Sequence, residues 1–353
     1  MIICRTPFRI SFFGGGTDYP AWYRENGGAT LVTTISKYCY ITCRWLPPFF
    51  EHRSRIVWSK IERVKETGEI EHPAVREALR YLDIRHGIEV HHDGDLPART
   101  GLGSSSAFTV GLLHALYGLK GVMPSKRQLA LEAIHVEQAR IGENVGCQDQ
   151  VAAAFGGFNR IDFERNDGIQ VSPVLLNSAR LADLQGHLML CFTGISRTAS
   201  EIAGEQIKAT SQKKEELRAI YGMVSEAVRI LQSDEDLEAF GRLLHESWKL
   251  KRSLTHRIST PMIDEIYEAA RRAGAIGGKI LGAGGGGFLL LFAKPERQSE
   301  VREALRDLLH VPVQFESSGS RVIFYDPDGY DPERAGLGVP QGEGANTARG
   351  ILT

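Results

Sequence analysis

The sequence lacks paired cysteines, a long apolar run and an excess of one charge. Its 353 residues include five cysteines, an odd number, with no CxxC pair, which indicates reduced, mostly buried thiols in a cytosolic protein. No apolar segment approaches the roughly 20 residues that span a bilayer, and Arg5 and Arg9 interrupt the N-terminal run, so no secretory signal is predicted. Net charge is −1, which argues against nucleic-acid or membrane partners. We therefore expect a cytoplasmic protein.

Three nucleotide-binding or hydrolytic motifs are also missing or misplaced. No GxxxxGK[ST] string occurs, so a Walker A loop is excluded. The hydrolase elbow GxSxG fails at its last position in GSSSA (103–107), which disfavours a serine hydrolase. The dinucleotide fingerprint GxGxxG does occur, at Gly282, Gly284 and Gly287. That motif must open a helix, whereas here it precedes the apolar run FLLLF, so we discount a dehydrogenase.

Length and periodicity indicate a two-domain α+β protein. We place a domain boundary near residue 190, which gives an N-terminal domain (1–190), a C-terminal domain (191–330) and a mobile tail (331–353). Hydrophobic alternation and helical spacing predict strands at 2–13, 29–46, 88–92, 188–193, 288–293 and 321–325, and helices at 73–84, 106–119, 125–141 and 295–310, with long helices between 199 and 273.

Glycine is concentrated in three stretches: GGGTDYP (14–20), GLGSSSA (101–107) and LGAGGGGF (281–288). Glycine lets backbone N–H groups approach a ligand, and a helix N-terminus adds unpaired donors and partial positive charge. GLGSSSA precedes a predicted helix, so its loop can wrap a polyphosphate while its serine hydroxyls reach phosphate oxygens or Mg²⁺. The alternative for GLGSSSA is a glycine-rich turn with a serine N-cap, and LGAGGGGF fits a glycine-rich hairpin equally well.

Two carboxylates are candidates for the rest of a phosphoryl-transfer site. Asp149 follows a helix end and a Gly-x-x turn, and we place it in a loop where it can meet an acceptor hydroxyl. Glu137 lies on the preceding predicted helix and can hold magnesium. The alternative is that both are ordinary solvated acids.

Taken together, the three stretches resemble the motifs of the GHMP small-molecule kinases. PFRISFFGGGTDY (7–19) is similar to PGRxNxxGEHTDY, PARTGLGSSSA (97–107) to PxxxGLGSSA, and KILGAGGGGF (279–288) to KxxGAGxGG. Their order and spacing cover nearly the whole chain. The resemblance implies the two-domain GHMP kinase fold, with an N-terminal domain like domain 2 of ribosomal protein S5 and a ferredoxin-like C-terminal domain. It also implies ATP and Mg²⁺.

The resemblance assigns roles residue by residue. It implies that Arg9 and Asp149 are catalytic, that Asp18 binds sugar hydroxyls, and that Ser105 and Glu137 hold the metal. It implies a nucleotide site made by Pro97, Gly101, Leu102, Gly103, Ser104, Ser105 and Ser106, with Gly284 and Gly285 on the acceptor side. Gly15 and Gly16 stand where galactokinases carry Glu and His, which argues against galactose and leaves room for a larger sugar.

Further segments resemble the branch of the family that phosphorylates D-glycero-D-manno-heptose 7-phosphate on its C1 hydroxyl. They are VTTISKYCYITCR (32–44), HHDGDLPARTGLGSSS (91–106), ENVGCQDQ (143–150) and TGISRTAS (193–200). We expect Arg197 to bind the 7-phosphate, the alternative being a surface arginine near a helix cap. Other open hypotheses are a GHMP kinase for another sugar, of fucose or galactose type, and a non-catalytic relative that senses nucleotide or sugar.

Overall fold

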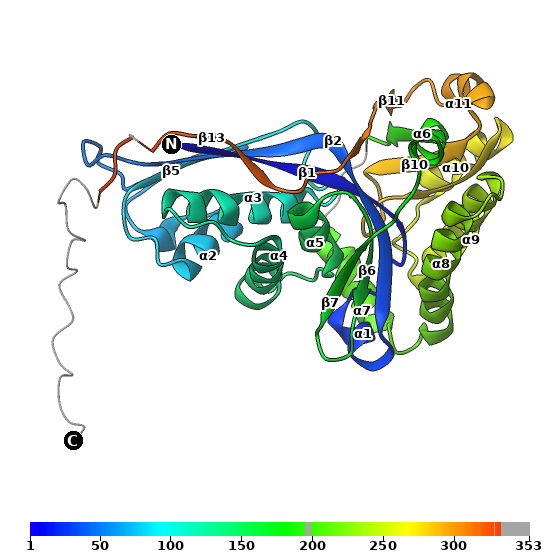
Figure 1. Cartoon of the computed structure of the whole chain (residues 1–353), viewed down its shortest axis with the longest axis horizontal. Coiled ribbons are helices and arrows are strands. Elements are labelled where there is room, and N and C mark those ends of the chain that lie inside the picture. The colour runs from blue at the N-terminus through cyan, green and yellow to red at the C-terminus, as the bar shows by residue number, and fades with distance from the viewer. Residues whose placement is uncertain (195–198, 328, 333–353) are drawn as a thin grey trace.

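The protein folds into two sheets with helices packed on them (Figure 1). The computed structural model describes residues 1–194, 199–327 and 329–332. Arg197 and the segment after Pro332 therefore lie outside the described residues. In the described part of the chain, no helix is long and apolar enough to cross a bilayer.

The first sheet has the strand order β13-β1-β2-β5-β3-β4, with β6 and β12 also paired to β2 and β7 paired to β6. Its strands are β1 (Ile2–Phe13), β2 (Gly28–Trp45), β3 (Ser54–Val57), β4 (Ile61–Val64), β5 (Ile88–Gly94), β6 (Phe158–Phe163), β7 (Ile169–Pro173), β12 (Phe315–Glu316) and β13 (Arg321–Tyr325). β3 runs parallel to β5, and the other pairs among the described residues are antiparallel.

β2 is long because β-branched and aromatic residues predominate from Thr30 to Trp45 and neither proline nor glycine interrupts them. It pairs first with β6 and, from Cys39 onward, with β5. β1 runs beside both parts, and its register with β2 shifts between Pro7 and Phe8, where proline supplies no ladder N–H. Beyond that shift, the amide of Arg9 donates to the carbonyl of Leu102 (3.0 Å). β1 is thereby joined to the second glycine stretch.

Helices cover one face of the first sheet. They are α2 (Pro73–Tyr81), α3 (Ser104–Leu119), α4 (Lys126–His135), the π-helical turn η2 (Val136–Ile141) and α5 (Gln148–Phe155), and Figure 1 shows α2, α3, α4 and α5 on the same side of β1, β2 and β5. α3 is the central one, because it is apolar around most of its circumference and is buried from Ser106 to Leu113. It packs closely at Gly111, where a Cβ would lie 2.7 Å from Thr6 Oγ1.

The second sheet has the order β11-β8-β10-β9. It consists of β8 (Leu188–Phe192), β9 (Ala275–Ile280), β10 (Phe288–Ala293) and β11 (Leu309–His310), accompanied by α6 (Ser178–Gly186), α7 (Ala199–Ala209), α8 (Lys214–Gln232), α9 (Glu238–Leu254), α10 (Pro261–Arg272) and α11 (Gln298–Ala304). Short elements complete the chain: α1 (Pro20–Asn26), η1 (Thr67–Glu69) and η3 (Pro295–Arg297).

The end of β1 meets α9 at the junction of the two sheets. Phe12 and Phe13 pack edge-to-face on Phe240 of α9, with ring centroids 5.5 and 5.2 Å apart. Lys279 of β9 donates to the carbonyl of Phe12 (2.9 Å). The sheets therefore share one apolar core, and the ends of β1 and β9 lie next to each other.

Most of the predicted elements are confirmed, with three corrections. The helix predicted at 106–119 begins at Ser104. The helix predicted at 295–310 is confined to Gln298–Ala304, after one 3₁₀ turn. The third correction concerns Asp149, which lies in the first turn of α5 and not in a loop, because the alanine-rich sequence after it continues as a helix.

The division of the chain near residue 190 stays a prediction. β8 begins there and belongs to the second sheet, whereas β12 and β13 return to the first sheet and pair with β2 and β1.

Candidate active site

A cavity of about 210 Å³ lies where the three glycine stretches converge. Its lining comes from β1 and the loop after it, from the loop before α3, from the start of α5, and from α7, α9 and the loop after β9. The predicted residues that line it are Arg9, Gly15, Gly16, Asp18, Gly101, Gly103, Ser104, Ser105, Ser106 and Asp149. Segments far apart in the sequence are thus brought together here.

Arg9 and Asp149 form a bidentate ion pair at the N-terminus of α3. Arg9 Nε and Nη2 donate to the two carboxylate oxygens of Asp149 at 2.8 and 2.7 Å. Arg9 Nη1 donates to the carbonyl of Gly101 (2.6 Å). Gly103, the N-cap of α3, approaches this pair so closely that its Cβ would lie 3.2 Å from Arg9 Cγ and 3.3 Å from Asp149 Oδ2. The absence of a side chain at residue 103 therefore lets the ion pair reach the helix terminus.

The N-terminus of α3 presents unpaired donors to the cavity. Gly103 has a left-handed conformation (φ 73°), and no side chain caps the helix. The first amides of a helix have no partner within it, and the helix dipole adds positive charge there. Ser104, Ser105 and Ser106 bring their hydroxyls to the same place. This end of the cavity is suited to a polyphosphate.

Glu137 is buried behind Ser106 at 1% exposure. Its Oε2 accepts hydrogen bonds from Ser106 Oγ (2.9 Å) and from the side-chain amide of Gln150, whereas its Oε1 has no partner among the described residues. Burial raises the pKa of Glu137 to about 7, against the lowering effect of its hydrogen bonds. Glu137 itself does not line the cavity, whereas the other predicted metal ligand, Ser105, does. The serine that contacts Glu137 is Ser106.

Asp18 holds the loop that leads into α5. Its side chain is 2% exposed and accepts from the amides of Gly16 (3.0 Å) and Gln148 (3.4 Å). A Cβ on Gly146 would overlap this carboxylate, so Gly146 is required for the contact. Burial, together with the charge of Asp149, raises the pKa of Asp18. Asp18 therefore both lines the cavity and positions the start of the helix that carries Asp149.

The remaining predicted residues do not reach the cavity. Pro97 is exposed, and its carbonyl accepts from Thr100 Oγ1 (2.7 Å). Leu102 is fully buried in the core. Of the third glycine stretch, Gly282 and Ala283 line the cavity, whereas Gly284 and Gly285 pack against Ile258.

Sequence reasoning missed several polar residues of this cavity: Ser11, Gln148, Lys251 and Lys279. Ser11 Oγ and Gln148 Oε1 are buried and have no partner among the described residues. The two lysines are almost fully buried, at 7% and 3% exposure. Gln148 lies beside Asp149 in the quoted ENVGCQDQ string and could have been noticed there, but Lys251 lies outside all three glycine motifs.

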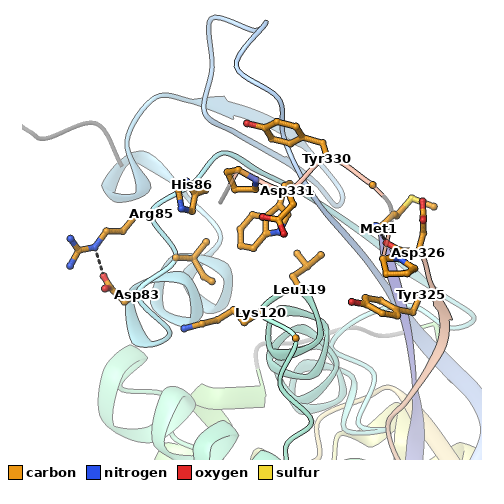
Figure 2. Close-up of a pocket in the computed structure, with 16 residues that line it drawn as sticks. Met1, Asp83, Arg85, His86, Leu119, Lys120, Tyr325, Asp326, Tyr330 and Asp331 are labelled. Atoms are coloured by element: carbon orange, nitrogen blue, oxygen red, sulfur yellow. Dashed lines mark hydrogen bonds and ion pairs between the residues drawn. The ribbon is translucent and has the colours of Figure 1, made fainter. Parts of the chain in front are cut away.

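A larger cavity of about 540 Å³ lies at the opposite end of the first sheet, where Met1 lies near residues 325–327 and 329–332 (Figure 2). Met1 and Tyr325 border it on one side and Arg85 and His86 on the other, and Arg85 is paired with Asp83 (2.8 Å). None of the three glycine motifs contributes to it. We therefore place the candidate active site in the smaller cavity.

Comparison with known proteins identifies the family. Residues 69–157 match the family described as GHMP kinases N terminal domain, and residues 217–311 match GHMP kinases C terminal. A mevalonate kinase from Pyrococcus horikoshii is 30% identical over 248 residues, which cover 68% of this chain and 69% of that protein. The chain belongs to the GHMP kinase family.

Two further proteins are similar to this GHMP kinase over most of its length. The D-glycero-alpha-D-manno-heptose 7-phosphate kinase of Campylobacter jejuni is 27% identical over 313 residues, covering 86% of this chain and 92% of the relative. A crystal structure of a D-glycero-D-manno-heptose 1-phosphate kinase from Bacteroides thetaiotaomicron superposes with a TM-score of 0.75 at 24% identity, covering 92% of this chain and all of the other. The latter shows that the GHMP kinase fold extends over nearly the whole chain.

Proposed function

We propose that this GHMP kinase transfers the γ-phosphoryl group of ATP to the anomeric C1 hydroxyl of D-glycero-D-manno-heptose 7-phosphate. The product would be the 1,7-bisphosphate, a precursor of nucleotide-activated heptose for surface polysaccharide. The Arg9–Asp149 pair at the open end of α3 carries the kinase part of this proposal. The sugar part is supported by the Campylobacter relative, whose similarity extends over most of both chains.

The phosphates of ATP would lie over the first turn of α3. Glycines at 101 and 103 leave the backbone accessible, and the serine hydroxyls add polar contacts to phosphate oxygens. The γ-phosphorus would then face the Arg9–Asp149 pair, which Gly103 approaches from the helix side. Pro97 and Leu102 would support this loop from outside the cavity.

The donor set around Glu137 fits Mg²⁺. A buried carboxylate with one unpartnered oxygen lies against a serine hydroxyl, and Mg²⁺ prefers a few protein oxygens completed by phosphate oxygens and water. Glu137 would hold the ion together with the hydroxyls of Ser105 and Ser106. When bound, Mg²⁺ neutralises phosphate charge.

The acceptor sugar would occupy the side of the cavity opposite α3. Gly15 presents bare backbone there, and a Cβ on it would lie 3.7 Å from the side-chain amide of Gln148 and 3.9 Å from Ser11 Oγ. The unpartnered oxygens of Ser11 and Gln148, together with the carboxylate of Asp18, are suited to sugar hydroxyls. Gly16 also lacks a side chain and would leave further space for the sugar on the same side of the cavity.

Asp149 would accept a hydrogen bond from the C1 hydroxyl and orient its oxygen toward the γ-phosphorus. As the new O–P bond forms, the bond between the γ-phosphorus and the β–γ bridging oxygen breaks, and its electron pair leaves with ADP. The hydroxyl proton passes to Asp149. Arg9 offsets negative charge on the moving group and holds Asp149 in place.

The 7-phosphate needs a cation of its own. We propose Arg197 for this role, although it lies outside the described residues. Arg197→Ala should raise KM for the sugar phosphate and leave KM for ATP unchanged. An equal rise in both constants would contradict this assignment.

A coupled ADP-release assay with heptose 7-phosphate, galactose, fucose and mannose tests the proposed function. We expect rapid ADP release with heptose 7-phosphate and little with the other sugars. Preference for another sugar would reassign the acceptor within the family, and ATP binding without turnover of any sugar would favour a sensor.

A further inference from the structure

The candidate active site contains a buried ammonium group with no acidic hydrogen-bond partner. Lys251 of α9 lines the cavity at 7% exposure. Its Nζ donates to the backbone carbonyls of Ile280 (3.2 Å) and Gly282, and no carboxylate of the described residues forms an ion pair with it. Lys249, two residues earlier on the same helix, is exposed and pairs with Glu246 (3.0 Å). A buried charge without a counter-ion is costly unless a ligand compensates it.

The backbone partners of Lys251 place it close to the catalytic pair. Gly282 packs directly on Gly101, since a Cβ on either residue would overlap the backbone of the 101 or 281–282 segment. The carbonyl of Gly101 in turn accepts from Arg9 Nη1. Burial and, next, the charge of Arg9 lower the pKa of Lys251 to about 7, against the opposing charges of Asp18 and Asp149. The charges of Arg9, Asp18 and Asp149, which line the candidate active site, therefore also act on Lys251.

Much of the donor capacity of Arg9 is already used by protein partners. Arg9 directs three of its donors to Asp149 and to the carbonyl of Gly101. A phosphoryl group in transfer spreads its charge over three oxygens, so the guanidinium alone leaves part of that charge without a close cation. Lys251 carries three N–H groups, two of which bind carbonyls. The third remains for a ligand in the cavity.

We propose that Lys251 is a catalytic residue whose ammonium group binds the transferred phosphoryl group beside the Arg9–Asp149 pair. This role rests on the proposed function in requiring a phosphoryl donor, but it does not depend on which sugar is the acceptor. It explains why a lysine on a helix of the second sheet is buried against the glycine loop. The competing explanation is that Lys251 only fastens that loop through its two carbonyl contacts.

Kinetics of Lys251→Met, Lys251→Arg and the control Lys249→Met separate these explanations. We expect Lys251→Met to lower kcat by 100-fold or more, with KM for the sugar changed less than threefold, and Lys251→Arg to recover at least tenfold of the loss. Lys249→Met should match the wild type. A wild-type kcat in Lys251→Met, or a loss confined to KM for the sugar, would overturn the proposal.

The pH profile supplies a readout that loop fastening would not change. The charged groups facing Lys251 are Arg9 on β1, Asp18 after it, Asp149 on α5 and Lys279 on β9. Since Lys251 loses its proton as the pH rises, kcat/KM of the wild type should fall above about pH 7. Lys251→Arg keeps its charge, so the fall should disappear. A profile that is the same in both proteins would contradict a charged role.

A sugar-free probe distinguishes failure of this inference from failure of the proposed acceptor. Beryllium fluoride with MgADP mimics the γ-phosphoryl group, and its binding is followed by thermal shift. We expect a further shift over MgADP alone in the wild type, at least tenfold weaker binding of beryllium fluoride in Lys251→Met, and an unchanged shift by MgADP. No response in the wild type, or an equal response in both proteins, would overturn the role of Lys251 even if heptose 7-phosphate proves to be the substrate.

Discussion

The substitution Asp149→Asn removes one charge from the catalytic pair and leaves the shape of the side chain unchanged. The Asp149 side chain is 25% exposed and Arg9 is 4% exposed, so the two charges interact at the edge of the cavity, partly shielded from water. Asparagine retains a carbonyl oxygen for one of the two Arg9 donors, but it cannot accept the proton of the acceptor hydroxyl. Binding of MgATP should remain nearly intact, because the α3 terminus is untouched.

The expected loss in turnover is roughly 100-fold or more, which is the usual contribution of a positioned acid–base group. Stability should also fall, since a hydrogen bond to a charged group contributes about 2 kcal/mol. At about 2.1 cal/mol/K of unfolding entropy per residue, the 353 residues give roughly 0.7 kcal/mol per degree. The melting temperature should therefore drop by about 3 °C.

A coupled assay for ADP and a thermal melt measure both effects on the same samples. Asp307→Asn is the matched control, because Asp307 is exposed after α11 and should change neither quantity. Turnover of Asp149→Asn within threefold of the wild type would refute a catalytic role for Asp149. Loss of MgADP binding together with turnover would show that the substitution disrupts the site as a whole.

Three further substitutions test the glycine contacts and the buried acid. Gly101 and Gly121 both have positive φ (86° and 69°), but a Cβ on Gly101 would overlap the Leu281 carbonyl, whereas Gly121 faces open space. Gly101→Ala should therefore lower the unfolding free energy by 2 kcal/mol or more beyond the roughly 1 kcal/mol expected for Gly121→Ala. Equal losses in denaturant melts would contradict the packed contact. Gly15→Ala meets no backbone overlap, so it should fold normally and raise KM for the sugar but not for ATP; an unchanged sugar KM would remove Gly15 from the acceptor wall. Burial raises the pKa of Glu137 from 4.5 to about 7 in the metal-free chain, so the folded protein should lose about 3 kcal/mol of stability as the pH rises from 4.5 through 7. Glu137→Gln has no such proton to lose, so in EDTA its stability relative to the wild type should increase by that amount between pH 4 and 8. A stability difference that does not change with pH would argue against a buried carboxyl.

Elements with a strong hydrophobic period could be predicted from the sequence. β1 alternates clearly after Pro7, and α3 carries an apolar run long enough to be recognised as a buried helix. The hairpin of β3 and β4 was missed because each strand has only four residues and is partly exposed. Such strands form through pairing with β5 and with each other, which a local pattern does not contain.

The residues of the candidate active site could likewise be predicted only in part. Arg9, Asp18 and Gly103 of the glycine motifs do meet Asp149 in one cavity. Four other motif residues lie outside it: Pro97, Leu102, Gly284 and Gly285. The helical position of Asp149 was not predicted, because the polar string before it is typical of a loop.

Lys251 shows most clearly what the sequence alone does not predict. In the sequence WKLK (248–251), two lysines stand two residues apart, and composition does not tell which one is buried. Only the helical spacing of Leu244, Trp248 and Lys251, all buried in the structure, indicates that residue 251 shares the apolar face. The backbone carbonyls that it binds come from β9 and the loop after it, and that contact depends on tertiary structure.

The most direct test of the proposed mechanism is a crystal structure of the protein with Mg²⁺ and a non-hydrolysable ATP analogue. The triphosphate should lie on the backbone of residues 101–106 at the start of α3, with its terminal phosphorus facing Asp149 and Arg9. A triphosphate bound elsewhere, with the carboxylate of Asp149 directed away from it, would contradict the account.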